Sequence, residues 1–493
     1  MALIDLNIPA GIYRNGTDLQ AQGRWRDANL VRWHDGVMRP IGGFRTRSDT
    51  AGANKLRGML TWSDNSSDRW IAAGSYNKLY IWNASGTQFD ITPAGLTGGR
   101  EDALAFTGYG GNIYGSFAYG VARPDTSRIQ PATSWHLESW GEDLLACNED
   151  DGKIYQWELN TGTAAAVLSN APTSNSGIVV TEERFLFALG AGGNPRKVQW
   201  SDREDNNTWT PAATNEAGDL ELNTTGAIIK GVSVKGQTLI LTTRDAHVAN
   251  YIGPPYVYGI ERVGTSCGLA ANEACVVVDQ GAFWMGVNSF YAYTGGAVQE
   301  MPCDVSDYVF NDINKAQVSK AFGVSNSMFG EIWWCYPSSG STENDRYVTY
   351  NYVENTWAIG ELDRTAGSDR GSFRQPMFAK ASDNKIYEHE VGLEYGGLTP
   401  FAESGPFRIA TGDNVMSVVE MLPDEKTQGD VNATFKTRFY PNGVERNYGP
   451  FSMSNPTSLR FTGRQVRLRI EGDRYTDWRV GINRLDVVPG GRR

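Results

Sequence analysis

The chain has 493 residues, a formal net charge of −11, 56 glycines, and an aromatic set of 15 Trp, 22 Tyr and 19 Phe. This length exceeds the roughly 250 to 300 residues at which a single hydrophobic core stops growing, so we expect several structural units or a closed array of repeats. The glycine count exceeds the roughly 34 expected from an average usage of about 7%, which favours short strands with tight turns and argues against a helical bundle.

Signals for metal binding, disulfides and membrane insertion are missing from the sequence. The four histidines lie far apart and the five cysteines form no CxxC pair, so zinc-finger spacing is absent and a secreted disulfide framework is disfavoured. No apolar run approaches the roughly 18 residues that span a bilayer, and the first residues do not resemble a signal peptide. We expect a soluble protein made in a reducing cytoplasm, without a cofactor.

Residues 1–50 are predicted to form an N-terminal arm. They are rich in turn-forming residues but contain Trp25 and Trp33, which need a surface to cover them. The body of its own chain is the preferred docking site, and a neighbouring subunit is the alternative.

Residues 51–400 repeat one pattern: an apolar strand, a turn of Gly, Asn, Asp or Ser, and a second strand with alternating apolar residues. The first strands occupy 69–74, 104–108, 143–147, 184–190, 239–244, 282–286, 331–336 and 377–381, and the second strands 78–82, 112–116, 153–157, 196–200, 246–251, 289–293, 346–350 and 385–389. Their spacing is close to the about 40 to 45 residues of a four-stranded blade. The pattern predicts a β-propeller with an open blade count, and a long β-sandwich is the alternative.

Residues 304–322 break this repeat. Val305, Tyr308, Val309 and Ile313 recur at nearly helical spacing, with acidic residues in the first turn. The segment is predicted to form one or two short helices between blades.

Residues 401–493 are predicted to form a β-sandwich, because longer strands with period-two alternation replace the hairpins. In 434–443 and 464–470 the apolar residues alternate with Lys436, Arg438, Arg467 and Arg469. These four side chains form a predicted basic face that could contact an acidic partner or phosphate. A solvated face without a partner is the alternative.

The net negative charge of the chain comes from its central section. Residues 51–400 hold 24 basic and 40 acidic side chains, whereas residues 1–50 carry a net charge of +2 and residues 401–493 carry +3. This distribution argues against tight binding of nucleic acid by the middle section, because like charge disfavours contact with phosphate.

Motifs for catalysis are not recognisable in the hairpin region. No HExxH helix and no GxxxxGK[ST] loop is present, and a sialidase-like turn is approximated only by Glu204, Asn206, Thr208 and Trp209. We therefore predict that the protein is not an enzyme. A propeller glycosidase and a carbohydrate- or receptor-binding propeller are the alternatives.

Five stretches of the sequence resemble the nozzle, tail accessory or packaged-DNA stabilisation proteins of short-tailed bacteriophages. They comprise residues 11–43, 198–222, 302–337, 403–415 and 464–487. The resemblance implies a β-propeller subunit of a homohexameric ring that docks below the tail adaptor, contacts tail fibres or spikes, retains packaged double-stranded DNA and forms the channel for its ejection. It also implies a virion protein made in the host cytoplasm, and it does not separate a nozzle from a related tail-hub component.

Overall fold

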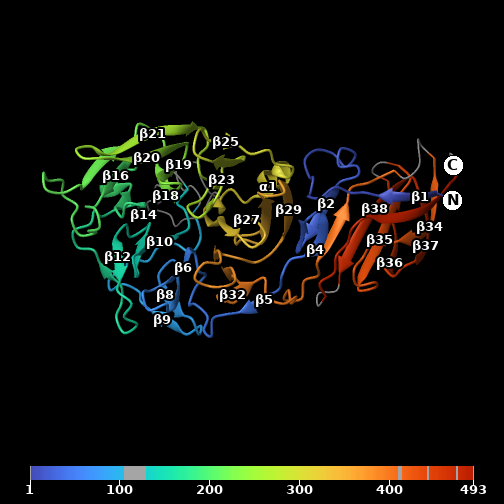
Figure 1. The fold of residues 1–493 in the computed structure, drawn as a ribbon, viewed down its shortest axis with the longest axis horizontal. Helices are drawn as coiled ribbons and strands as arrows, with labels where there is room; N and C mark the ends of the chain where they lie inside the picture. Colours follow the sequence, from blue (N-terminus) through green and yellow to red (C-terminus); the bar gives the residue numbers. More distant parts are fainter. Residues whose placement is uncertain (1, 105–128, 409–413, 441–442, 473–475, 492–493) are drawn as a thin grey trace, which may run out of the picture.

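The computed structural model describes residues 2–104, 129–408, 414–440, 443–472 and 476–491. The molecule is elongated, with a β-propeller at one end and a β-sandwich at the other (Figure 1). The predicted fold class, an all-β protein with a propeller, an N-terminal arm and a C-terminal sandwich, is confirmed. None of the described helices is long and apolar enough to cross a membrane.

Within the described residues, seven four-stranded antiparallel sheets form the blades of the propeller. Blade 1 contains β6 (Met59–Ser63), β7 (Arg69–Gly74), β8 (Leu79–Asn83) and β9 (Gln88–Asp90). Blade 2 contains β10 (Trp135–Trp140), β11 (Asp143–Asn148), β12 (Ile154–Trp157) and β13 (Ala166–Val167). Blade 3 contains β14 (Gly177–Val180), β15 (Leu186–Leu189), β16 (Lys197–Trp200) and β17 (Gly218–Glu221), with the short 3-10 helix η1 (Ala191–Gly193) between β15 and β16.

The remaining blades complete the ring. Blade 4 contains β18 (Ile228–Val234), β19 (Gln237–Thr242), β20 (Asp245–Gly253) and β21 (Val257–Thr265). Blade 5 contains β22 (Cys275–Val278), β23 (Gly281–Met285), β24 (Phe290–Tyr293) and β25 (Gln299–Glu300). Blade 6 contains β26 (Phe322–Asn326), β27 (Glu331–Tyr336), β28 (Arg346–Asn351) and β29 (Thr356–Glu361). Blade 7 contains β30 (Ala366–Ser368), β31 (Met377–Ala379), β32 (Ile386–His389) and, from the arm, β5 (Phe44–Thr46).

The ring closes through the arm. The first strand of each blade contacts the first strand of the next, and β30 contacts β6. Strand β5 pairs antiparallel with β32, placing Phe44 opposite His389 and Thr46 opposite Tyr387. A strand from near the N-terminus therefore completes the last blade, which removes an exposed edge from the sheet.

Seven of the eight predicted hairpins form the two middle strands of the seven blades. The predicted pair at 104–108 and 112–116 lies outside the described residues, apart from Leu104. The predicted helical segment contains α1 (Ser306–Asp312) and the 3-10 helix η2 (Val318–Lys320), which lie between blades 5 and 6.

Aromatic residues fill the spaces between blades. Trp135 at the start of blade 2 is fully buried, and its Nε1–H donates to the Ser75 carbonyl of blade 1 over 2.7 Å. A Cβ atom at Gly74 would lie 2.2 Å from this indole ring. Glycine at position 74 therefore permits the close approach of the two blades.

In the part of the chain that the structure describes, the sandwich consists of a four-stranded and a five-stranded sheet. The first, in spatial order, contains β1 (Ala2–Leu6), β39 (Asn483–Pro489), β34 (Met416–Leu422) and β37 (Thr457–Gly463). The second contains β2 (Trp25–Asn29), β33 (Phe401–Ser404), β38 (Gln465–Gly472), β35 (Val431–Arg438) and β36 (Arg446–Ser452). Phe435 and Phe461 stack between the sheets with ring centroids 4.7 Å apart.

The arm contributes to both parts of the molecule. Its strands β1 and β2 belong to the sandwich and β5 belongs to blade 7. Between them, β3 (Val31–His34) and β4 (Val37–Pro40) form a hairpin that lies where the propeller meets the sandwich (Figure 1). The arm therefore ties the two parts together.

Candidate functional site

The four residues of the predicted basic face lie together on the five-stranded sheet. Lys436 and Arg438 belong to β35, and Arg467 and Arg469 belong to the neighbouring strand β38. Lys436 is directly opposite Arg467 in the register of this pair. The period-two pattern thus placed these side chains on one face of the sheet.

Carboxylates of the same chain surround this face. Glu403 lies 2.7 Å from the Lys436 ammonium, 3.6 Å from Arg467 and 3.4 Å from Arg469. Asp18 of the arm lies 2.5 Å from Arg467 and 3.5 Å from Arg438. A phosphate group would have to displace these partners, so contact with an external anion stays a prediction, and the visible role of the face is to hold the arm.

A second charge cluster is buried at the junction of arm and propeller, and no pattern in the sequence indicates it. Arg32 of β3 lies 2.8 Å from Glu331 and 2.5 Å from Glu390, and all three side chains are at most 6% exposed. Glu390 also accepts hydrogen bonds from the Gly42 N–H and the Asn326 amide. We call Arg32, Glu331 and Glu390 the junction triad.

Burial and ion pairing act in opposite directions on the pKa values of the junction triad. Burial would raise the pKa of Glu390, but attraction to the Arg32 guanidinium and hydrogen bonds outweigh it and hold that pKa below its ordinary value. The two carboxylates likewise outweigh the burial of Arg32 and raise its pKa. The pKa of Glu331 is raised, because burial dominates at that carboxyl. The triad therefore fixes the arm hairpin against blades 6 and 7.

Side chains link opposite parts of the propeller on the face where the chain enters the first strand of each blade. Lys320, before blade 6, is fully buried and bonds to Asp102, before blade 2, and to Glu343 at 2.6 Å. Gln317 exchanges two hydrogen bonds of 3.0 Å with the backbone of Ala103. These contacts join blades that are not neighbours, so they reach across the channel mouth.

Beside this bridge is a cavity of about 340 Å³ with mainly aliphatic walls. Its polar lining includes Glu149, whose pKa is raised to about 7 by burial, and Asn272, which donates to Ser134 over 3.2 Å. On the first strand of blade 2, burial also raises the pKa of Glu138 to about 7, and on the first strand of blade 4 Lys230 pairs with Glu273 at 2.9 Å. Two carboxyl groups can therefore hold protons near neutral pH, but among the described residues no serine or cysteine bonds to a histidine to form a nucleophile.

Residues 264–268 read GTSCG and match the GxSxG pattern of nucleophile elbows. Ser266 is exposed, with φ of 57°, at the end of β21. The stretch continues into the connection to blade 5, whereas an elbow requires a strand followed by a helix. The match therefore lacks the structural context of a hydrolase site.

No family model and no curated protein matches the chain. Among solved structures, a streptogramin B lyase matches 70% of this chain and 96% of its own with 12% identity and a TM-score of 0.40. A virginiamycin B lyase from Staphylococcus aureus, with quinupristin, matches 70% of this chain and 99% of its own with 10% identity and a TM-score of 0.39. The WD40 β-propeller domain of Doa1 covers 70% of this chain and 97% of its own with 10% identity and a TM-score of 0.42. Likenesses at this level concern the fold alone and assign no activity.

Proposed function

We propose that this protein is a non-enzymatic structural subunit of a short-tailed bacteriophage tail. It forms the nozzle at the tip of the tail tube, docks below the adaptor, retains packaged DNA and forms part of the channel for ejection. The observation that carries this proposal is where the stretches resembling that family lie: four of the five, far apart in sequence, meet at the junction between propeller and sandwich.

The contacts among these stretches are direct. From 11–43, Asn15 donates to the Cys303 carbonyl of 302–337 over 2.7 Å, and the junction triad joins the same two stretches through Arg32 and Glu331. Strand β2 pairs with β33, whose last two residues, Glu403 and Ser404, belong to 403–415. Met38 and Val480 of 464–487 exchange backbone hydrogen bonds of 3.2 and 3.0 Å. Four of the resembling stretches therefore lie together in space, as expected if the feature shared with that family is the connection between propeller and sandwich.

An elongated subunit whose propeller and sandwich are rigidly connected suits a tail component that must withstand the pressure of packaged DNA. A buried charge triad adds little net stability over apolar packing, but it penalises any other arrangement of the groups that it joins. The arm therefore resists changes in the angle between propeller and sandwich. A ring of such subunits would transmit force from its docked end to its tip without bending at the junction.

The DNA path in this proposal lies between subunits. The Lys320 bridge links parts of the ring that are not neighbouring blades, so it obstructs the propeller channel of a single chain and DNA would pass through the lumen of the subunit ring. The net acidic charge of residues 51–400 would let DNA slide along that lumen with little adhesion.

The experiment is native mass spectrometry with negative-stain imaging of the purified chain, alone and mixed with the adaptor protein. We expect six copies in a ring with an open lumen, with the adaptor present if the ring requires a template. A compact monomer under both conditions, without binding to the adaptor, would overturn the proposal.

A further inference from the structure

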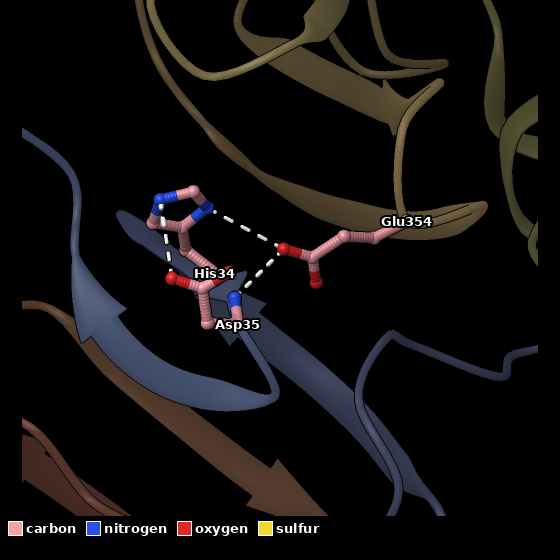
Figure 2. Close-up of side chains that lie close together, drawn as sticks. All are labelled: His34, Asp35 and Glu354. Carbon is pink, nitrogen blue, oxygen red and sulfur yellow. Dashed lines mark hydrogen bonds and ion pairs between the residues drawn. The ribbon is translucent and has the colours of Figure 1, made fainter.

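A histidine and two carboxylates meet at the outer edge of the arm junction (Figure 2). His34 is the last residue of β3 and Asp35 follows it in the hairpin turn, while Glu354 lies in the turn between β28 and β29 of blade 6. One ligand atom from each of the three residues lies within 4.8 Å of the others. The cluster therefore joins two segments that are some 320 residues apart in the sequence.

The surroundings fix the orientation of two of the three side chains. The His34 ring lies edge-on to Phe329, with centroids 5.8 Å apart. Glu354 accepts the backbone N–H of Asp35 at 2.7 Å through Oε1, and its own N–H donates to the Asn351 side chain at 2.9 Å. Asp35 has a left-handed backbone, with φ of 53°, and its side chain is 88% exposed. The His34 imidazole and the Glu354 carboxylate are therefore held in place, whereas the Asp35 side chain is free to rotate.

The spacing of His34 and Glu354 matches a pair of metal ligands. His34 Nδ1 is shielded from solvent, has no hydrogen-bond partner among the described residues, and lies 3.4 Å from Glu354 Oε1. Two ligands that bind zinc tetrahedrally at about 2.0 to 2.2 Å are separated by roughly 3.3 Å. The His34–Glu354 pair therefore needs almost no movement to bind an ion.

We propose that His34, Asp35 and Glu354 bind one divalent transition-metal ion, for which Zn²⁺ is the probe. His34 supplies Nδ1, Glu354 supplies Oε1, and Asp35 turns its carboxylate from the Nε2 side, where it lies 3.8 Å away, to complete the protein ligands. One imidazole with two carboxylates suits zinc and neighbouring transition metals, whereas Ca²⁺ and Mg²⁺ prefer oxygen ligands alone. The bound ion would pin the tip of the arm hairpin to blade 6.

The test is isothermal titration of the full-length chain with Zn²⁺, using Glu354→Gln as the main variant. Glutamine keeps the oxygen that accepts the Asp35 N–H, so the metal-free melting temperature should stay close to that of the original chain. We expect one ion per chain, with binding weakened at least about 10-fold by Glu354→Gln and by His34→Ala, and less strongly by Asp35→Asn.

Glu361→Gln is the matched control, because Glu361 is an exposed carboxylate at the other end of β29. It should leave zinc affinity unchanged, and Ca²⁺ should not compete with zinc. An ordinary ion pair between His34 and Glu354 predicts no zinc binding at all. Absence of binding, or equal affinity in the original chain, His34→Ala and Glu354→Gln, would overturn the proposal.

Discussion

Two charge clusters hold the arm, and they differ in exposure to water. The junction triad is almost completely buried, whereas the cluster of Asp18 and Glu403 with the basic face has side chains 6 to 29% exposed. A buried ion that loses its partner is left without water in the partner's place, whereas a partly exposed ion is rehydrated. The two clusters should therefore contribute very differently to the attachment of the arm, although both pair arginine with two carboxylates.

The largest effect is expected from Arg32→Ala. This change leaves Glu331 and Glu390 buried without a cation, which should destabilise the native state by about 3 to 5 kcal/mol. Thermal melting and hydrogen exchange of the β2–β4 segment measure it. Arg45→Ala is the control, because Arg45 also belongs to the arm but has a 64% exposed side chain, and its buried partner Glu388 keeps Arg47 at 3.3 Å. Its loss should therefore cost at most about 1 kcal/mol. Equal effects of the two changes would contradict the comparison.

Buried carboxyl groups without a dominant cation nearby should change the free energy of unfolding with pH in the opposite sense to Glu390. The pKa of Glu138 and of Glu149 is raised to about 7, so between about pH 4.3 and 7 the folded chain holds more protons there than the unfolded chain does. The free energy of unfolding should therefore fall as pH rises through this window. Glu390, with its lowered pKa, contributes stability above the ordinary glutamate pKa that is lost as pH falls through its folded value.

Glutamine variants separate these contributions. Glu149→Gln keeps an acceptor for the Ser134 hydroxyl and cannot ionise, so it should flatten the pH dependence of the melting temperature between pH 5 and 8. Glu300→Gln, a change at an exposed residue of β25, should leave that dependence as it is. If Glu149→Gln left the slope of melting temperature against pH unchanged, this would contradict the interpretation that Glu149 holds a proton in the cavity beside the Lys320 bridge.

The smallest effect is expected at the partly exposed cluster of Asp18 and Glu403 with the basic face. Asp18→Asn removes one carboxylate near Arg26, Arg438 and Arg467, and should destabilise the chain by about 1 kcal/mol or less, with the loss shrinking in high salt. Urea unfolding at low and high ionic strength measures both. A cost comparable with that of Arg32→Ala, or one that salt does not reduce, would show that exposure does not set the difference between the clusters.

The sequence predicted features that depend on neighbours in the chain. Alternating strands and turn residues located seven blade hairpins, and near-helical spacing located α1. The ring closure could not be predicted, because Phe44 pairs with His389 and a three-residue strand carries no periodic signal. The position of the basic face on one side of a sheet could be predicted. The ion pairs of its residues with Asp18 and Glu403 could not, because they depend on which strands are neighbours. For the same reason the junction triad and the His34–Glu354 pair could be found only in three dimensions.

The most direct test of the structural role is cryo-electron microscopy of a virion that contains this chain. The account predicts six copies at the tip of a short tail, each an elongated body with a seven-bladed propeller and a sandwich, arranged around an open lumen. It also predicts that the propeller channels of the individual subunits are empty of DNA. Absence of the chain from the tail, or DNA running through a single propeller, would contradict the account.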